Sequence, residues 1–359
     1  MYKILLVEDT KSDVKSCADS VDIMNRQNSD IQIEIDIASS YENALEKLNK
    51  DYANFAGVII DIKLNGENTG NEIIEQIINQ YRLPVAVMTG TPDTILEEDS
   101  PIHIYKKGED KYQDIINNLI KTVNTGLFNV IGGKGRIETT MNQIFWRNLY
   151  PQAEMWEKLK EEGYETEKIL LRFAISHIQE LLDYEVPKYV TQEMYIKPPI
   201  TEDINTGSIV KNKEDGIYYV VLSPPCDLAI HDGKMKTDTV MICEIEPLEG
   251  ISKEVIGEAS SPKKKAKCLK KAITNNYTEF YHWLPQNELF VGGYINFRHV
   301  YNYSPDELKN QFEKPELHIS SYFVKDILSR FSAYYARQGQ PDFKFDEEAE
   351  KLVKKIFGE

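Results

Sequence analysis

Acidic side chains follow apolar runs in the N-terminal third of the chain, where a parallel sheet would gather them. Glu8 and Asp9 come directly after "KILLV" (3–7), and Asp61 ends the run "GVIID" (57–61). Bare carboxylates are rarely buried without a partner, so an acid at the end of a core strand needs a reason. Three neighbouring carboxylates repel one another, and a hard divalent cation such as Mg²⁺ relieves the repulsion because it takes oxygen ligands.

A hydroxyl and an amine follow two further apolar runs. Thr89 lies near the end of "PVAVMTG" (84–90), and Lys106 follows "IHIY". A lysine supplies compensating positive charge, and a hydroxyl beside it can hold a phosphoryl oxygen. Lys107 is the neighbouring alternative to Lys106, which is preferred because it comes directly after the apolar residues. The set predicts a site for a metal ion and a phosphoryl group, with Asp61 as the nucleophile.

The elements that must position these side chains alternate between strand and helix. Ser39 or Ser40 can cap the second helix. This alternation predicts an α/β doubly wound, parallel five-stranded sheet, in which ligands bind at the carboxyl ends of the strands. The expected strands are 3–7, 31–38, 57–61, 84–90 and 102–106, and the expected helices are 11–26, 41–50, 70–81 and 110–123.

Residues 1–125 resemble the receiver domain of response regulators in two-component signalling. The resemblance is carried by "LVED", "IIDIKLNGENTG", "MTG" and "IYKK", in that order along the chain. It implies a flavodoxin-like fold and a histidine kinase as the partner that phosphorylates Asp61. The sequence departs from the family at Lys107, where a proline usually follows the lysine. It also departs in "TPDTILEEDS" (91–100), which leaves room for about two helical turns.

The resemblance also implies a role for each site residue. Asp61 is the phosphoacceptor, and Mg²⁺ is the cofactor. The implied metal ligands are Glu8, Asp9, Asp61 and the main-chain carbonyl of Lys63, and the groups implied to bind the acyl phosphate are Thr89 and Lys106.

Length, charge and cysteine usage narrow the class of protein. The chain has 359 residues, which favours two or three domains, and its net charge is −16. Residues 1–125 carry 12 Lys+Arg and 22 Asp+Glu, a net charge of −10, so the remaining net charge is −6. Neither part offers the basic field that nucleic-acid binding needs, and the lysines of 261–271 are typical of a solvated helix face or loop.

The expected location is the cytoplasm. No apolar run approaches the roughly 20 residues of a membrane span, and "MYKILLVED" lacks the features of a signal peptide. The four cysteines are widely spaced, which fits reduced thiols better than a disulfide framework.

The rest of the chain divides at about residue 186. Residues 126–185 are expected to form a glycine-containing hinge (124–138) and a helical segment. Residues 186–359 are expected to form an α+β domain with a small β-barrel or twisted sheet and a C-terminal helix over 319–340. The strand-like runs are 207–212, 216–223, 239–247 and 292–303.

"VVLSPPCDLA" (220–229) is the one motif of this part that suggests chemistry. Cys226 has Asp227 beside it and His231 five residues on. An adjacent acid disfavours the reactive thiolate, and a rigid Pro-Pro turn explains the motif without catalysis. Zinc binding by Cys226, His231, Cys243 and His282 is an alternative with poor spacing.

The sequence therefore predicts a cytoplasmic response regulator with a C-terminal interaction module that does not bind DNA. A receiver without a catalytic output can also act as a phosphate sink or buffer. Receivers with unusual C-terminal halves occur in bacterial antiphage systems, including the Detocs type, and a role in antiviral defence is therefore a family-level guess. A second effector protein, or a second copy of this chain, is a further possible partner. The alternative is a receiver-controlled enzyme, with a nuclease, hydrolase or thiol enzyme in the C-terminal half.

Overall fold

The computed structural model describes residues 1–64, 69–90, 102–133, 135–185, 188–231, 233–337 and 343–358. The chain divides into two compact units, Met1–Glu185 and Val186–Glu359. The loop at 65–68 and the segment at 91–101 lie outside the described residues, and with them the short helix expected between the fourth and fifth strands.

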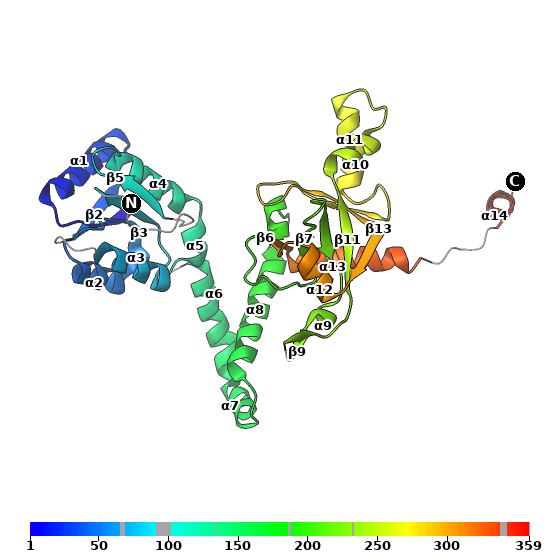
Figure 1. The fold of residues 1–359 in the computed structure, drawn as a ribbon, viewed down its shortest axis with the longest axis horizontal. Coiled ribbons are helices and arrows are strands. Elements are labelled where there is room, and N and C mark those ends of the chain that lie inside the picture. The colour runs from blue at the N-terminus through cyan, green and yellow to red at the C-terminus, as the bar shows by residue number, and fades with distance from the viewer. Residues whose placement is uncertain are drawn as a thin grey trace. The chain divides into compact units, whose positions relative to one another are not determined.

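The first unit opens with a five-stranded parallel sheet in the order β2-β1-β3-β4-β5 (Figure 1). The sequence prediction of a doubly wound α/β fold is confirmed. The strands are β1 (Tyr2–Val7), β2 (Ile33–Ala38), β3 (Phe55–Ile60), β4 (Val85–Thr89) and β5 (His103–Lys106). The helices are α1 (Lys11–Gln27), α2 (Tyr41–Asp51), α3 (Thr69–Gln80) and α4 (Tyr112–Asn124).

Helices cover both faces of this sheet, which explains its continuous apolar strands. In β1, Leu5 and Val7 belong to the core that includes residues of α2 and α3. Ile4 and Leu6 belong to the opposite core, with residues of α1 and α4. The capping hydroxyl of α2 is that of Ser40, which accepts a hydrogen bond from the amide of Asn43 at 3.3 Å.

The glycine-containing stretch after α4 contacts other parts of the first unit. It contains α5 (Leu127–Ile131), and Gly133 lies so close to Tyr52 that a Cβ would fall 2.1 Å from its hydroxyl. An ion pair of 2.7 Å joins Arg82 to Glu138. These contacts join the stretch to the domain of the five-stranded sheet, and the hinge expected at 124–138 stays a prediction.

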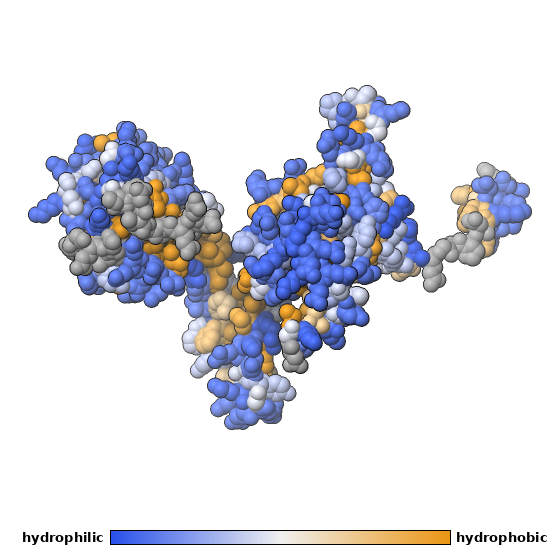
Figure 2. All heavy atoms as spheres, viewed as in Figure 1, coloured by the Kyte–Doolittle hydropathy of each residue, from blue (hydrophilic) through white to orange (hydrophobic). Residues whose placement is uncertain are grey.

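The rest of the first unit is helical, as expected. Its helices expose hydrophobic side chains, which appear as orange surface in Figure 2. They are α6 (Arg136–Ile144), a π-helical turn (Phe145–Leu149), a 3-10 turn (Tyr150–Gln152), α7 (Ala153–Glu161) and α8 (Thr166–Glu185).

The second unit is built on a curled seven-stranded sheet in the order β12-β13-β11-β8-β7-β14-β6. All its strand pairs are antiparallel, and no described pair joins β12 to β6, so the sheet is a half-barrel rather than a closed barrel. Its strands are β6 (Tyr195–Ile196), β7 (Ser208–Lys211), β8 (Tyr218–Val221), β11 (Val240–Glu246), β12 (Tyr281–Leu284), β13 (Gly293–Tyr303) and β14 (Leu317–Ile319). A two-stranded ribbon is formed by β9 (Ile230–His231) and β10 (Lys234–Met235).

Helices complete the second unit. The aromatic helix α13 (Ser321–Tyr335) packs on the half-barrel through Val324 and Ile327, so its stripe is largely core. The lysine-rich run forms α11 (Pro262–Ile273), whose lysines are exposed. The remaining helices are α9 (Pro225–Leu228), α10 (Leu248–Ile256), α12 (Pro305–Gln311) and α14 (Phe345–Phe357). In the described residues, no helix is long and apolar enough to cross a membrane.

Candidate functional site

The topology of the first sheet brings the predicted site residues to one edge. β1 lies between β2 and β3, and all five strands run parallel, so their carboxyl ends meet. The backbone ladder continues one residue past the strands. The amide of Asp61 donates to the Val7 carbonyl at 2.9 Å, and the amide of Lys107 donates to the Thr89 carbonyl at 2.9 Å. These bonds fix the residues after β3 and β5 beside their neighbours.

Three carboxylates meet at this edge, as the sequence predicts. Oxygens of Glu8, Asp9 and Asp61 all lie within 4.8 Å of one another. Glu8 is 1% exposed and Asp61 is 7% exposed, while Asp9 is half-buried. An all-oxygen donor set with three negative charges fits a hard cation such as Mg²⁺, which usually binds through one or two carboxylates and several waters.

Lys107, not Lys106, reaches the carboxylates. The Lys107 amine lies 2.6 Å from Glu8 Oε2, 2.8 Å from Asp61 Oδ2 and 2.7 Å from Asp13 Oδ2. Lys106 instead forms an exposed ion pair of 2.6 Å with Glu109. The preference for Lys106 is corrected, because successive residues of a strand point to opposite faces and the site side belongs to the residue after β5.

Burial and mutual contact set the electrostatics of this cluster. Burial raises the pKa of Glu8, and bonds from the Lys107 ammonium and from the Thr10 amide, at 2.9 Å, partly offset that rise. Burial alone would lower the pKa of Lys107. Its hydrogen bonds to Asp13, Asp61 and Glu8 outweigh burial and raise that pKa well above the ordinary value. Lys107 is therefore a fixed positive charge at neutral pH.

Asp13 is the member of the cluster that sequence reasoning missed. It lies in the first turn of α1, where an acid is also favoured by the helix dipole. Its position four residues after Asp9 was the available signal. That signal is weak, because acids in a first helical turn are common for the same electrostatic reason.

The two remaining predicted residues also lie at this edge. Thr89 ends β4 and is 1% exposed. Lys63 follows Asp61 in the next loop, and its amide lies 3.4 Å from Asp61 Oδ1. The roles of the Thr89 hydroxyl and of the Lys63 carbonyl remain predictions.

The cysteine motif of the second unit shows no catalytic arrangement in its described contacts. Cys226 is exposed, and its thiol lies 3.6 Å from Asp227 Oδ1. Cys243 is buried and donates to the Asn296 carbonyl at 3.0 Å. The four residues considered for zinc do not form a group among the described residues.

A second group of possible metal ligands lies on the half-barrel, formed by Glu244, Glu246 and His299. His299 Nδ1 is 3.4 Å from an oxygen of each glutamate. The Tyr301 hydroxyl donates to Glu244 at 3.2 Å, and the Tyr281 hydroxyl donates to Glu246 at 3.0 Å. The protein itself thus supplies partners for both carboxylates.

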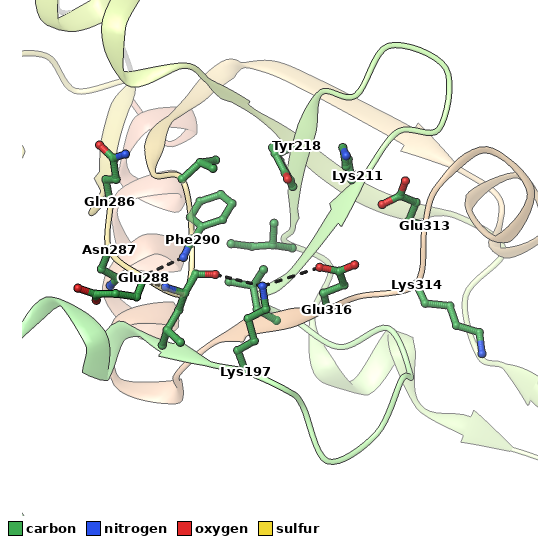
Figure 3. A pocket seen from close by; sticks show the side chains of 14 residues that line it. Lys197, Lys211, Tyr218, Gln286, Asn287, Glu288, Phe290, Glu313, Lys314 and Glu316 are labelled. Atoms are coloured by element: carbon green, nitrogen blue, oxygen red, sulfur yellow. Dashed lines mark hydrogen bonds and ion pairs between the residues drawn. The ribbon is translucent and has the colours of Figure 1, made fainter. Parts of the chain in front are cut away.

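A cleft of about 290 Å³ opens between the β6–β7–β14 edge of the half-barrel and the loop at 286–291 (Figure 3). Lys197 lies across it, 3.8 Å from Glu316 and 3.4 Å from the Leu289 carbonyl. Phe290 packs edge-on against Tyr218, with ring centroids 5.3 Å apart. The charges of both signs along this cleft single out no class of ligand.

Comparison with solved structures returns receiver domains that cover about a third of the chain. A CheY-like receiver domain from Methylobacillus flagellatus is 15% identical, covers 33% of this chain and 98% of its own, and has a TM-score of 0.26. A receiver domain from Clostridium thermocellum is 22% identical, with coverages of 35% and 98% and a TM-score of 0.29. One from Methanospirillum hungatei is 16% identical, with coverages of 35% and 95% and a TM-score of 0.28. No family model and no curated protein sequence matches the chain.

Replacing Asp9 tests the metal site. Asp9→Ala is expected to weaken Mg²⁺ binding about tenfold or more, because it removes one of three carboxylates from a hard cation. Isothermal titration of the purified chain with Mg²⁺ measures the affinity. Asp19→Ala, which removes an exposed acid of α1, is the matched control. Equal affinities for the two variants would exclude Asp9 as a ligand.

Replacing each lysine in turn tests the corrected assignment. Lys107→Met is expected to destabilise the first unit by about 1–3 kcal/mol without divalent cation, because it leaves partly buried carboxylates without their shared counter-charge. Lys106→Met removes only an exposed pair and is expected to cost under about 1 kcal/mol. Hydrogen exchange of the β1 and β3 amides in EDTA measures this unit separately. A larger effect from Lys106→Met would instead assign the counter-charge of the carboxylates to Lys106.

Proposed function

We propose that residues 1–125 act as a phosphoryl-accepting receiver, with Asp61 as the acceptor and a histidine kinase as the donor. The observation that carries the proposal is the cluster itself. A nearly buried Asp61 lies within reach of two other acids and 2.8 Å from a lysine amine. The similar solved structures are receiver domains, and they are consistent with this proposal for the N-terminal third.

The proposed step is a transfer between two nucleophiles. A carboxylate oxygen of Asp61 attacks phosphorus and forms the new P–O bond, while the P–N bond of the kinase phosphohistidine breaks and its electron pair returns to the imidazole. Mg²⁺, when bound, neutralises charge on the phosphoryl oxygens. Glu8, Asp9, Asp61 and the Lys63 carbonyl are the groups proposed to hold it.

The remaining residues would orient the phosphoryl group and balance its negative charge. Lys107 places a permanent positive charge beside Asp61, which favours an anionic phosphoryl group at this edge. Thr89, at the end of the adjacent strand, is proposed to hold a phosphoryl oxygen. Lys106, which pairs with Glu109 in this structure, is left without a proposed catalytic role.

For the second unit we propose an interaction module rather than an enzyme. Cys226 is exposed beside an acid, and its described contacts include no base or cation that would activate the thiol. A receiver with such a module can serve as a phosphate sink or buffer in a phosphorelay. Its place in an antiphage system of the Detocs type is the most specific form of this proposal.

Asp61→Asn tests the acceptor directly. The variant is expected to take up no phosphoryl group from acetyl phosphate in Mg²⁺, because an amide of nearly the same shape cannot attack phosphorus. Intact mass spectrometry measures incorporation, and Asp30→Asn, at an exposed position, is the matched control. Equal incorporation in Asp61→Asn and in the unmodified chain would refute the assignment.

Cys226→Ser separates the module from the thiol-enzyme alternative. The variant is expected to keep cellular activity near that of the unmodified chain, whereas Asp61→Ala loses it, because only the acceptor performs chemistry. Both variants are compared in cells that carry the intact signalling system, at matched protein levels on a blot. Loss of activity with Cys226→Ser alone would make the enzyme interpretation the better one.

A further inference from the structure

The helical segment of the first unit has almost no core of its own. Among the side chains described in α6, α7 and α8, only Ile144 and Ala174 are buried. Helices of this length are stabilised mainly by packing an apolar face against another element. Because so few of these side chains are buried, part of the apolar surface of the helices is left for another element to cover. Figure 2 shows hydrophobic surface along these helices.

Two apolar stripes run along α8, and the inner one packs within this helical segment. The inner stripe includes Phe173, whose ring packs against Trp156 at 5.3 Å and against His177 at 4.6 Å. The outer stripe lies on another side of the helix. We call it the α8 seam, and its members are Leu171, Ile175, Ile178 and Leu182.

The α8 seam has the spacing of a coiled-coil interface. Its members are separated by four, three and four residues, which is the alternation of a and d positions in a heptad. Leu171 is 63% exposed, Ile175 52% and Leu182 45%, while Ile178 is half-buried. Apolar side chains at this spacing form a continuous ridge that fits the grooves of another helix.

We propose that the α8 seam pairs antiparallel with the α8 seam of a second copy of this chain, about a two-fold axis between Ser176 and His177. The order of the residues carries the choice of partner. The seam is a palindrome, Leu-Ile-Ile-Leu, so rotation by half a turn places Leu171 opposite the partner's Leu182. The same rotation places Ile175 opposite the partner's Ile178. An isologous interface needs this self-complementarity.

The charges beside the seam have the same symmetry. Arg172 and Asp183 are both exposed, and their spacing places them on one flank of the seam near its opposite ends. In the antiparallel pair, each Arg172 comes near the partner's Asp183, which gives two opposite-charge contacts. In a parallel pair the two-fold axis runs along the helices, so this flank of one helix and the same flank of the other lie on opposite sides of the pair, and the contact between Arg172 and the partner's Asp183 is lost. Charge complementarity therefore favours the antiparallel arrangement.

The size of the seam sets the expected strength. One seam of four apolar residues is smaller than the roughly 800 Å² per partner of a standard stable interface, so the dissociation constant should be on the order of micromolar or weaker. The association is independent of phosphoryl chemistry at Asp61, and its failure would leave the proposed receiver function untouched.

Sedimentation of the full-length chain over a range of concentrations tests the pairing. The unmodified chain is expected to shift from monomer to dimer as concentration rises. Ile175→Glu should raise the dissociation constant at least tenfold, because it places a charge within the seam. Met155→Glu adds the same charge at an exposed apolar position of α7, away from the seam, and should leave association nearly unchanged. Circular dichroism confirms that both variants remain folded.

Charge reversal tests the antiparallel register. Arg172→Glu alone should weaken association about threefold or more, because it places two acids together at each end. Adding Asp183→Arg should restore association, because each pair then has opposite charges again. A chain that remains monomeric at about 100 μM, a dimer indifferent to Ile175→Glu, or a double variant that stays weak would each overturn the proposal.

Discussion

The first unit depends on the balance of charge at the carboxyl edge of its parallel sheet. Glu8 and Asp61 are nearly buried there, and Asp9 and Asp13 lie beside them. Carboxylates at this depth destabilise a fold unless an opposite charge meets them. Lys107 supplies that charge from the residue after β5. This one ammonium group contacts acids that follow β1 and β3 and an acid in the first turn of α1. It therefore links these elements to the end of β5.

Most of the first unit could be predicted from its sequence because each strand is covered on both faces. Runs such as "KILLV" and "GVII" are then apolar throughout, and the helices between them show one apolar side. Glu8, Asp9 and Asp61 were recognised because an acid at the end of such a run is unusual. Lys107 was named only as the alternative to Lys106, because a choice between adjacent lysines is a choice of side-chain direction, which depends on where pairing with β4 ends. Asp13 was missed because helix starts attract acids for another reason.

The second unit was less predictable because its sheet is assembled from distant segments. β14 pairs with β7 across about a hundred residues, and β6 and β14 are only two and three residues long. Runs this short carry little alternation, so the sequence predicted β7, β8, β11 and β13 and missed β6, β12 and β14. Closure of a barrel depends on such edges, which is why the sequence left a small barrel and a twisted sheet as alternatives. The glycines at 132 and 133 were similarly ambiguous, since close packing and flexibility both favour glycine.

The three contacts of Lys107 have a consequence for what can be added to the site. An ammonium group has three N–H donors, and here Glu8, Asp13 and Asp61 take one each. Any new acceptor that bonds to Lys107 must therefore displace one of them. Asp13 is the most readily rehydrated of the three, at 31% side-chain exposure against 1% for Glu8 and 8% for Asp61. An acceptor that replaced Asp13 on Lys107 would therefore release the ion pair that joins the start of α1 to this edge of the sheet.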